Sequence, residues 1–249
     1  MNARDWDAAT YQRVSEPQLA WGVEVLARLD LAGDETVLDV GCGTGRVTAL
    51  LADRLPRGIV IAVDSAPSMV AAARATLGGR ARVICADVLE LELDEPVDAV
   101  FSTATLHWIL DHEQLFERLA GLLRADGRLV AQCGGEGNVE RFLAAAKRVM
   151  DREPYRPHFA SWGSTWRFAS AEATGSLLRS AGFSEARCWL SPASVVPPDP
   201  PAFLTSVCCR AHLPNLPSHL HERFIAEVLS EFGDPPEIDY VRLNIEARR

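Results

Sequence analysis

Short apolar runs alternate along the chain with segments whose apolar residues recur every three or four positions. The runs cover residues 36–40, 58–63, 81–86, 97–102 and 128–133. Continuous apolar runs of this length are typical of parallel strands that are covered on both faces. Helical spacing follows the first run, as at Val47, Leu50, Leu51 and Leu55. This strand–helix alternation predicts a mostly parallel sheet with right-handed crossovers.

The second half of the chain departs from this simple alternation. Helical patterns cover 138–150, 170–182 and stretches near 201–211 and 217–232, and a strand pattern covers 183–190. From residue 238 to the end, apolar and polar residues alternate, which is the period of a strand. Because this strand follows the excursion after 190 by a short link, we expect it to be antiparallel to the rest of the sheet.

Aromatic residues crowd the irregular stretch between Pro154 and Ser170. They are Tyr155, Phe159, Trp162, Trp166 and Phe168. Long irregular segments in compact domains are often functional, so one interpretation is a lid or pocket wall. The other is a small satellite core beneath the loop, and the two are compatible.

The predicted fold class is therefore α/β: a mostly parallel seven-stranded sheet with helices on both faces, its last strand antiparallel. Residues 1–249 form a single domain in this prediction. Its core consists of about 30–133, 170–192 and 237–249. Insertions at about 1–29, 134–169 and 193–236 build a helical and loop cap. Within the first of these, Ser15 and Gln18 form a capping-box pattern for a helix that runs to about Leu29.

The stretch from Thr36 to Arg46 combines a buried strand, a glycine turn and the start of a helix. Gly41, Gly43 and Gly45 stand at alternate positions, two residues after Asp39. The dinucleotide-binding fingerprint has Gly-x-Gly-x-x-Gly and places a pyrophosphate at the helix N-terminus. A carboxylate at position 39 would repel a pyrophosphate but accept hydrogen bonds from an ammonium group. The pattern therefore favours a cofactor that carries an amino acid.

Acids also stand at the ends of the next two strands. Asp64 follows the glycine turn by about 20 residues, the position from which a carboxylate accepts both ribose hydroxyls. Asp87 ends the third strand. Taken singly, Asp64 is also a candidate helix N-cap and Asp87 a turn former. Three successive strands that end in or beside an acid are a more specific pattern, because ligands of such sheets bind beyond these strand ends.

Composition narrows the class of partner. The formal net charge is -9 and no run of basic residues occurs, which disfavours a nucleic-acid substrate and favours a small molecule. The six cysteines are scattered and give no metal-binding spacing, so no metal is expected. Reduced thiols, no signal-peptide pattern at the start and no apolar run of about 20 residues predict a cytoplasmic protein without a membrane segment.

Residues 35–133 resemble the class I S-adenosylmethionine-dependent methyltransferases, a Rossmann-like family. The resemblance is carried by Asp39–Gly45, Asp64, Ala86–Val88 and the tip of the fourth strand. Thr105-Leu106-His107-Trp108, followed by an Asp-His pair, is similar to the small-molecule branch that includes trans-aconitate methyltransferases. The Asn-Pro-Pro-Tyr motif of enzymes that methylate bases or glutamine is absent after strand four.

The resemblance implies a role for each matched position. The glycine turn would pack against the methionine moiety, Asp39 would meet its ammonium, and Thr103 or Ala104 would offer a backbone carbonyl nearby. Asp64 would hold the ribose, and Asp87 with the Val88 N–H would read the adenine. The implied cofactor-binding set is Asp39, Gly41, Cys42, Gly43, Gly45, Asp64, Ser65, Met69, Asp87, Val88 and Thr103.

The predicted reaction is transfer of a methyl group from S-adenosyl-L-methionine to a small molecule, at a carboxylate or hydroxyl oxygen, with release of S-adenosyl-L-homocysteine. A carboxylate acceptor needs no base, whereas a hydroxyl benefits from one. His107 is the candidate base, and the alternative is a core or helix-capping histidine.

Tyr11, Trp108 and Trp166 are candidate substrate contacts. An acceptor like trans-aconitate would need cationic partners, for which the loops offer Arg141, Arg152, Arg156 and Arg167. The alternative functions are an NAD-dependent oxidoreductase and a non-catalytic S-adenosylmethionine-binding regulatory protein.

Overall fold

A seven-stranded sheet forms the centre of the computed structural model, which describes residues 16–232 and 236–249. Its strands are β1 (Thr36–Val40), β2 (Ile59–Asp64), β3 (Arg82–Cys85), β4 (Val97–Thr103), β5 (Leu123–Gly134), β6 (Glu185–Pro192) and β7 (Val241–Arg248), in the spatial order β3-β2-β1-β4-β5-β7-β6. β1 to β5 pair in parallel, whereas β7 runs antiparallel to both of its neighbours. The prediction of a mostly parallel sheet with an antiparallel last strand is confirmed.

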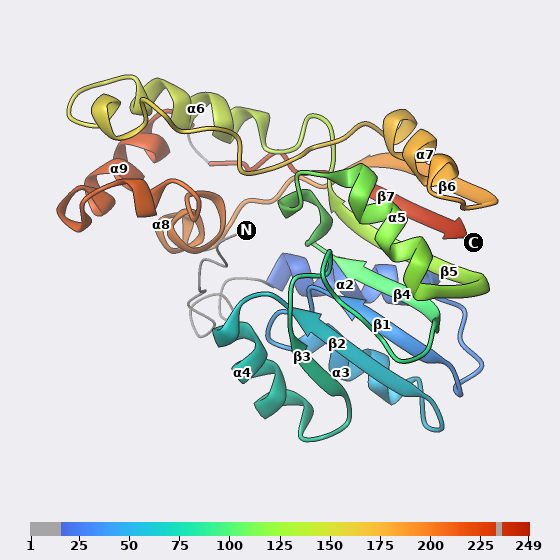
Figure 1. Ribbon diagram of the computed structural model, residues 1–249. Helices are drawn as coiled ribbons and strands as arrows, with labels where there is room; N and C mark the ends of the chain where they lie inside the picture. The colour runs from blue at the N-terminus through green and yellow to red at the C-terminus, as the bar shows by residue number, and fades with distance from the viewer. Residues whose placement is uncertain (1–15, 233–235) are drawn as a thin grey trace.

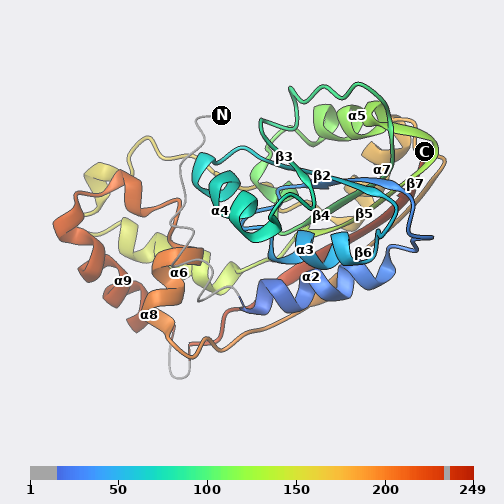
Figure 2. The ribbon, with the colours of Figure 1, turned by 90° about the horizontal axis from the view of Figure 1, so that it is seen from below.

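Helices cover both faces of the sheet (Figures 1 and 2). One face carries α2 (Glu16–Arg28), α3 (Arg46–Asp53) and α4 (Pro67–Leu77), and the other carries α5 (His112–Leu122) and α7 (Ala171–Ser180). Their apolar stripes bury against the strands, as Leu115, Phe116 and Leu119 of α5 do with no exposed surface. The sheet is therefore held rigidly from both sides, and the ends of its parallel strands are fixed in place.

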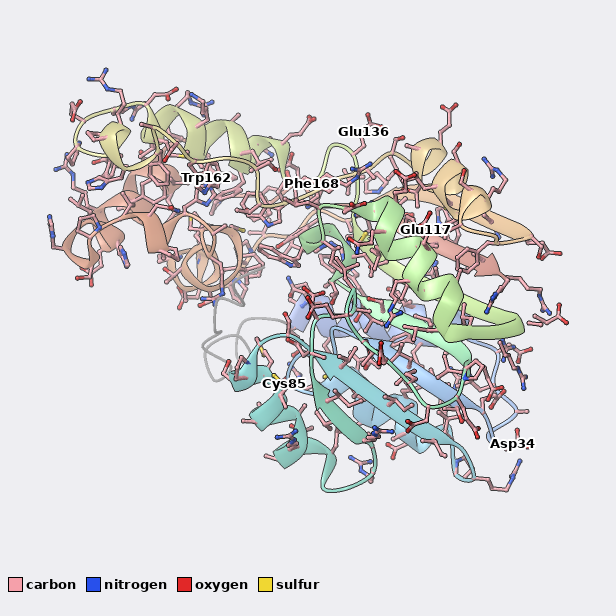
Figure 3. The ribbon with its side chains drawn as sticks, in the orientation of Figure 1. Asp34, Cys85, Glu117, Glu136, Trp162 and Phe168 are labelled. Carbon is pink, nitrogen blue, oxygen red and sulfur yellow. The ribbon has the colours of Figure 1, made fainter. Side chains whose placement is uncertain are left out.

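A second group of helices lies beside the sheet and has its own apolar cluster, which we call the cap. It contains α6 (Glu140–Met150), α8 (Pro200–Phe203) and α9 (His221–Ser230), linked by short 3-10 and π-helical turns at Arg156–His158, Leu204–Cys208, Leu213–Asn215 and Ser218–Leu220. Figure 1 shows these helices at the upper left, on the side of the sheet toward which the arrowheads of the parallel strands point. Figure 3 places Trp162 within the cap and Phe168 closer to the sheet.

The aromatic stretch serves as a satellite core and also reaches the site. Tyr155 is completely buried and Phe159 is 8% exposed, and both belong to the apolar cluster of the cap. The residues that follow, Ser164 and Thr165, line the main cavity. Both interpretations of this segment therefore hold, each for a different part of it.

Several predicted boundaries were wrong. The helix before β5 ends at Leu122, and the strand begins at Leu123 instead of residue 128, because Asp126 and Gly127 form a kink within the strand, with Asp126 at φ 62°. The regular helix expected near 201–211 is a four-residue α8 continued by a π-helical turn. None of the helices within residues 16–232 and 236–249 combines the length and the hydropathy that a membrane span requires.

Candidate active site

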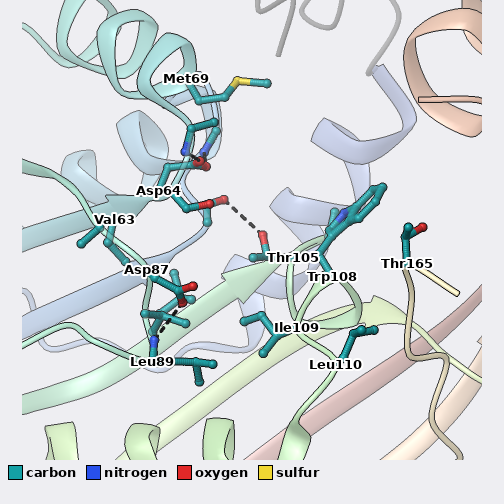
Figure 4. A pocket seen from close by; sticks show the side chains of 18 of the residues that line it. Val63, Asp64, Met69, Asp87, Leu89, Thr105, Trp108, Ile109, Leu110 and Thr165 are labelled. Carbon is teal, nitrogen blue, oxygen red and sulfur yellow. Dashed lines mark hydrogen bonds between the residues drawn. The ribbon is translucent and has the colours of Figure 1, made fainter. Parts of the chain in front are cut away.

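A cavity of about 630 Å³ opens at the carboxyl ends of the parallel strands, between the sheet and the cap. The strand side contributes the glycine turn, Asp64, Asp87 and Thr103, and the cap contributes Ser164, Thr165, Arg210 and Ala211. Figure 4 shows Asp64, Asp87 and Met69 on one side of this space and Trp108, Leu110 and Thr165 on the other. A cavity of this size and position is the expected binding site of a parallel α/β sheet.

The glycine turn bends the chain tightly from β1 into α3. Gly41, Gly43 and Gly45 all have positive φ, at 76°, 54° and 82°, a region that other residues rarely adopt. The N–H groups of Gly41 and Cys42 both donate to the carbonyl of Val63, at 2.8 and 3.0 Å, which fixes the turn against β2. A Cβ added at Gly43 would meet no atom within 4 Å, so the backbone there faces open space. The turn therefore leaves room for a ligand to approach the main chain.

Asp64 is held at the edge of the main cavity by backbone donors. Its Oδ2 accepts from the N–H of Gly43 and its Oδ1 from the N–H of Ala66, both at 2.9 Å. Burial raises its pKa, while these backbone hydrogen bonds lower it. Each carboxylate oxygen can accept more than one hydrogen bond, so both remain able to receive ligand hydroxyls.

Asp87 and its neighbours form the adjoining part of the same wall. Asp87 accepts from the N–H of Leu89 at 3.1 Å and lines the main cavity, next to Val88 and Leu89. Met69, on α4, lines the same part and is 3% exposed. This arrangement offers a carboxylate beside an apolar surface, which suits a flat heteroaromatic ring with an exocyclic amine.

Asp39 lies deeper than the other two acids. It is 3% exposed and its Oδ2 accepts from the hydroxyl of Thr48 at 2.7 Å. Burial raises its pKa to about 7, the Thr48 hydrogen bond opposes that rise, and the charge of Asp64 adds to it. Asp39 lines a second, smaller cavity of about 60 Å³, which shares Gly41, Gly43, Thr103 and Ala104 with the main one. A cation in this smaller cavity would favour the ionised form of the carboxyl.

Gln18 also lines the smaller cavity, and sequence reasoning assigned it only a capping role. Its Oε1 is buried and has no hydrogen-bond partner in the part of the chain that the structure describes. Leaving a buried acceptor unpaired is unfavourable by about 1–3 kcal/mol. An ammonium group in this cavity would donate to both Gln18 and Asp39, so these residues fit a cofactor that carries an amino acid. The sequence alone did not distinguish this position from a capping residue. In the structure, Gly22, one helical turn later, packs against Val47 of α3 and so brings Gln18 to the glycine turn.

The remaining predicted cofactor residues fall into two groups. Ser65, Met69, Val88 and Thr103 line the main cavity. Cys42 lines only the smaller cavity, and Gly45 is not among the residues lining either one. A Cβ added at Gly45 would lie 3.2 Å from the Cα of Ala73, so this glycine allows close packing of α3 against α4.

His107 lies away from the cavity, contrary to its predicted role as a base. It is 9% exposed, is not among the lining residues, and its Nδ1 accepts from the N–H of Gly134 at 3.3 Å. Burial lowers its pKa well below the usual value, and the charge of Arg242 lowers it further. A neutral imidazole that is occupied by the backbone and shielded from the cavity is a poor base, so the core alternative describes it better.

The predicted substrate contacts differ in their positions. Trp108, in the 3-10 turn Leu106–Trp108, lines the main cavity. Trp166 is not among the lining residues, but its ring lies 5.6 Å from that of Trp108 and its neighbours Ser164 and Thr165 reach the cavity. Tyr11 lies outside the described residues.

The cap end of the cavity carries a different chemistry from the strand end. Arg210 is the only Lys, Arg or His among the described residues that line it, and none of them is a Tyr or Cys. No group of three His, Cys, Asp or Glu side chains that could hold a metal occurs in residues 16–232 and 236–249. The charged side chains of the described lining are therefore one arginine and the carboxylates of Asp64, Asp87 and Asp111.

Comparisons with known proteins find methyltransferases. A methyltransferase-domain family model matches residues 37–127. The chain is 38% identical over 189 residues to a trans-aconitate 2-methyltransferase of Methylobacterium nodulans, covering 76% of this chain and 68% of that protein. It is also 38% identical over 128 residues to a trans-aconitate 2-methyltransferase of Shigella flexneri, but this match covers 51% of the chain and only 50% of that relative.

Solved structures show the same fold. Haemonchus contortus phosphoethanolamine N-methyltransferase 2, in complex with S-adenosyl-L-methionine, aligns with a TM-score of 0.62 at 16% identity, covering 97% of this chain and 56% of that one. The YcgJ protein from Bacillus subtilis aligns with the same TM-score at 15% identity, covering 92% of this chain and 97% of that one.

Proposed function

The chain belongs to the S-adenosylmethionine-dependent methyltransferases, and we propose that it methylates a carboxylate oxygen of a small-molecule acceptor. S-adenosyl-L-methionine is the cofactor of this family and S-adenosyl-L-homocysteine its product. The observation that carries the choice of a carboxylate is the cap end of the cavity, where Arg210 is the only Lys, Arg or His among the described lining residues.

The residues at the strand ends would hold the cofactor in this proposal. Asp39 and Gln18 would accept from its ammonium group in the smaller cavity. Asp64 would accept from the ribose hydroxyls, and Asp87, with the Val88 N–H, would bind the adenine. The support is that these groups already stand at adjacent points of one cavity system, with Gln18 lacking any other described partner.

The bound cofactor would supply an activated methyl group. The acceptor oxygen would attack the methyl carbon in line with the CH₃–S bond, so that an O–CH₃ bond forms, the CH₃–S bond breaks, its electron pair leaves with sulfur as a neutral thioether, and no proton moves. The protein therefore has to position the acceptor and exclude water, and such positioning can lower a barrier by about 7–11 kcal/mol. Arg210 would orient the carboxylate by a charge-assisted hydrogen bond. Trp108, Ile109 and Ala211 would keep water away from the reacting oxygen.

Other acceptors and functions fit the site less well. A phenol, alcohol or amine must lose a proton, and the described lining contains no His, Lys, Cys or Tyr to receive it. Of the acids that line the cavity, Asp64 and Asp87 would be occupied by the cofactor, and Asp111 caps α5 by accepting from the N–H of Gln114. A pyrophosphate would face the carboxylates of Asp39 and Asp64 beside the glycine turn. The curated relatives are named for methylation of trans-aconitate, which carries carboxylates, and this supports the same bond type here.

Two measurements test the proposal. We expect S-adenosylhomocysteine to raise the thermal midpoint of the purified protein and NAD to leave it unchanged. We also expect labelled methyl to pass from S-adenosylmethionine into a panel of carboxylic acids, giving products whose label is released as methanol by mild alkali. Label that survives alkali would indicate an ether or an amine and would contradict the proposal.

A further inference from the structure

We propose that Thr105 is a positioning residue for methyl transfer. Its side chain joins the glycine turn, on the cofactor side of the main cavity, to residues 106–110, which we call the wall segment. Trp108, Ile109 and Leu110 of this segment line the cavity. The kinetic part of the inference rests on the proposed function, whereas the link itself can be tested with S-adenosylhomocysteine alone.

The side chain of Thr105 occupies the space that a side chain at position 41 would need. A Cβ added at Gly41 would lie 2.0 Å from the Oγ1 of Thr105 and 2.3 Å from its Cγ2, closer than real Cβ atoms approach other atoms. The glycine is therefore required by this contact as well as by its φ of 76°. Two residues that are 64 positions apart in the sequence thus pack directly on each other.

The hydroxyl of Thr105 adds hydrogen bonds to this contact. Its Oγ1 lies 3.3 Å from the carbonyl oxygen of Gly41 and 3.0 Å from that of Thr103, and its one hydrogen can be donated to either. Gly41 follows β1 and Thr103 ends β4, so the hydroxyl ties the tips of two neighbouring strands together. In Figure 4, Thr105 lies between Asp64 on the cofactor side and Trp108 on the acceptor side.

The backbone around Thr105 connects this tie to the wall segment. Ala104 has a φ of 56°, which residues other than glycine seldom adopt, and its N–H donates to the carbonyl of Gln132 on β5 at 2.8 Å. After this sharp bend Thr105 begins the 3-10 turn, and its carbonyl accepts from the N–H of Trp108 at 2.9 Å. A shift of Thr105 would therefore move Trp108 with it.

The far end of the wall segment is fixed to the cap. The backbone N–H of Arg167 donates to the carbonyl of His107 at 2.8 Å, and its Nη1 donates to the carbonyl of Leu110 at 3.2 Å. The wall segment is therefore held by Thr105 on the cofactor side and by Arg167 on the cap side. Its position sets the distance between the two ends of the cavity.

This position matters because methyl transfer needs the acceptor atom in line with the bond that breaks. A misplacement of about 1 Å can lower the rate of such a reaction about 100-fold. Without the hydroxyl of Thr105, each ligand would still find its own side of the cavity, but the wall segment could shift relative to the glycine turn. We therefore expect kcat to fall and the affinities for both ligands to change little.

Hydrogen exchange of the full-length protein with S-adenosylhomocysteine tests the link without an acceptor. In the wild type, the ligand should slow amide exchange both in the glycine turn and in the wall segment. In Thr105→Val, which keeps the shape but lacks the hydroxyl, the turn should stay protected and the slowing in the wall segment should fall about threefold or more.

Thr174→Val is the matched control. Thr174 is completely buried in α7, and its hydroxyl donates to the carbonyl of Ser170 at 2.8 Å. The substitution removes the same kind of hydrogen bond away from the cavity, so it should leave the exchange pattern of the wall segment unchanged.

Kinetics provide the second readout, with an acid that the alkali-release assay identifies as an acceptor. We expect Thr105→Val to lower kcat about tenfold or more, while the KM values and the S-adenosylhomocysteine affinity stay within about threefold. Thr105→Ser, which keeps the hydroxyl, should restore kcat to within about threefold of the wild type. A merely structural role would lower the thermal midpoint without this split between kcat and KM.

The outcomes separate this inference from the function on which its kinetic part rests. Equal slowing of exchange in the wild type and Thr105→Val, or no slowing in the wild-type wall segment, would overturn the link. Wild-type kcat in Thr105→Val would overturn the positioning role. If no acid is methylated while S-adenosylhomocysteine binds, the proposed function fails and the exchange experiment still decides the link. Thr105→Ala replaces Thr105→Val in both measurements if the latter does not fold.

Discussion

The two ends of the main cavity are built in different ways. At the strand end, Asp64 and Asp87 stand at the tips of adjacent parallel strands and accept hydrogen bonds from nearby backbone N–H groups. At the cap end, the lining comes from three separate segments, at 108–111, 164–165 and 210–211. The first end is fixed by the register of the sheet, and the second depends on how long insertions pack.

This difference corresponds to a division of labour. Every member of the family binds the same cofactor, so that end can be built from a rigid and repeated framework. The acceptor varies, and residues on irregular segments can be exchanged without disturbing the sheet. If this division is correct, substitutions at one end should change the binding of one ligand and leave the other almost unaffected.

The largest effect is expected from Asp64→Asn. The amide would lose the charge that receives two ribose hydroxyls, and hydrogen bonds to a charged group contribute about 1.5 kcal/mol each or more. We therefore expect about a 100-fold weaker affinity for S-adenosylhomocysteine by calorimetry. Asp53→Asn is the matched control, since Asp53 pairs with Arg80 at the surface. Similar losses in both variants would indicate a general electrostatic effect and not a contact.

Arg210→Gln should affect the opposite end. Removing one charge-assisted hydrogen bond of about 2 kcal/mol should lower kcat/KM for a carboxylic acid about 30-fold while the affinity for S-adenosylhomocysteine stays within twofold. Arg152→Gln, which removes a charge from the cap away from the cavity, serves as the control. A loss of cofactor affinity in Arg210→Gln would show that the two ends are not separable.

Gln18→Met should weaken S-adenosylhomocysteine binding about tenfold, because it removes one acceptor for the ammonium group. It should also leave the thermal midpoint of the ligand-free protein unchanged or higher, since the Gln18 Oε1 has no described partner to lose. The exposed Gln114→Met on α5 is the control. A variant that loses stability but not affinity would instead make Gln18 a structural residue.

The smallest effect concerns the pH dependence of the ligand-free protein. Because the folded-state pKa of Asp39 is raised to about 7, its contribution to stability is present at low pH and is lost as pH rises from about 4 to 7. Asp39→Asn should remove this loss. Between pH 6 and pH 8, the unfolding free energy of the variant should therefore rise by about 1 kcal/mol relative to that of the wild type. Urea unfolding at both pH values measures it. An unchanged difference would mean that Asp39 is already ionised at pH 6.

The positions of the residues at the strand end could be predicted from the sequence, and those at the cap end could not, for a physical reason. The alternation of apolar runs and helices predicts a parallel sheet, and a parallel sheet brings the ends of its strands together. The sequence alone therefore predicts that Asp39, Asp64 and Asp87 lie near each other. Arg210 and Thr165 lie in irregular segments, where no periodicity relates sequence position to spatial position. The sequence offers Arg141, Arg152, Arg156 and Arg167 as cations on loops, and no pattern in it singles out Arg210.

His107 and Gln18 show the same limit at single residues. His107 follows β4, but the turn that leads into Leu106–Trp108 directs it to the core, where the Gly134 N–H occupies its Nδ1. Gln18 matched a capping pattern, and only the packing of α2 against α3 revealed that it borders the glycine turn. In both cases a local pattern was compatible with two positions, and tertiary packing selected one.

A crystal structure of the full-length protein with S-adenosylhomocysteine is the most direct test of the central claim. We predict the ammonium group between Asp39 and Gln18, the ribose hydroxyls within hydrogen-bond distance of Asp64, and the adenine beside Asp87, with the sulfur facing the cap end of the cavity. A ligand bound elsewhere, or in the reverse orientation with its adenine toward Arg210, would contradict the account.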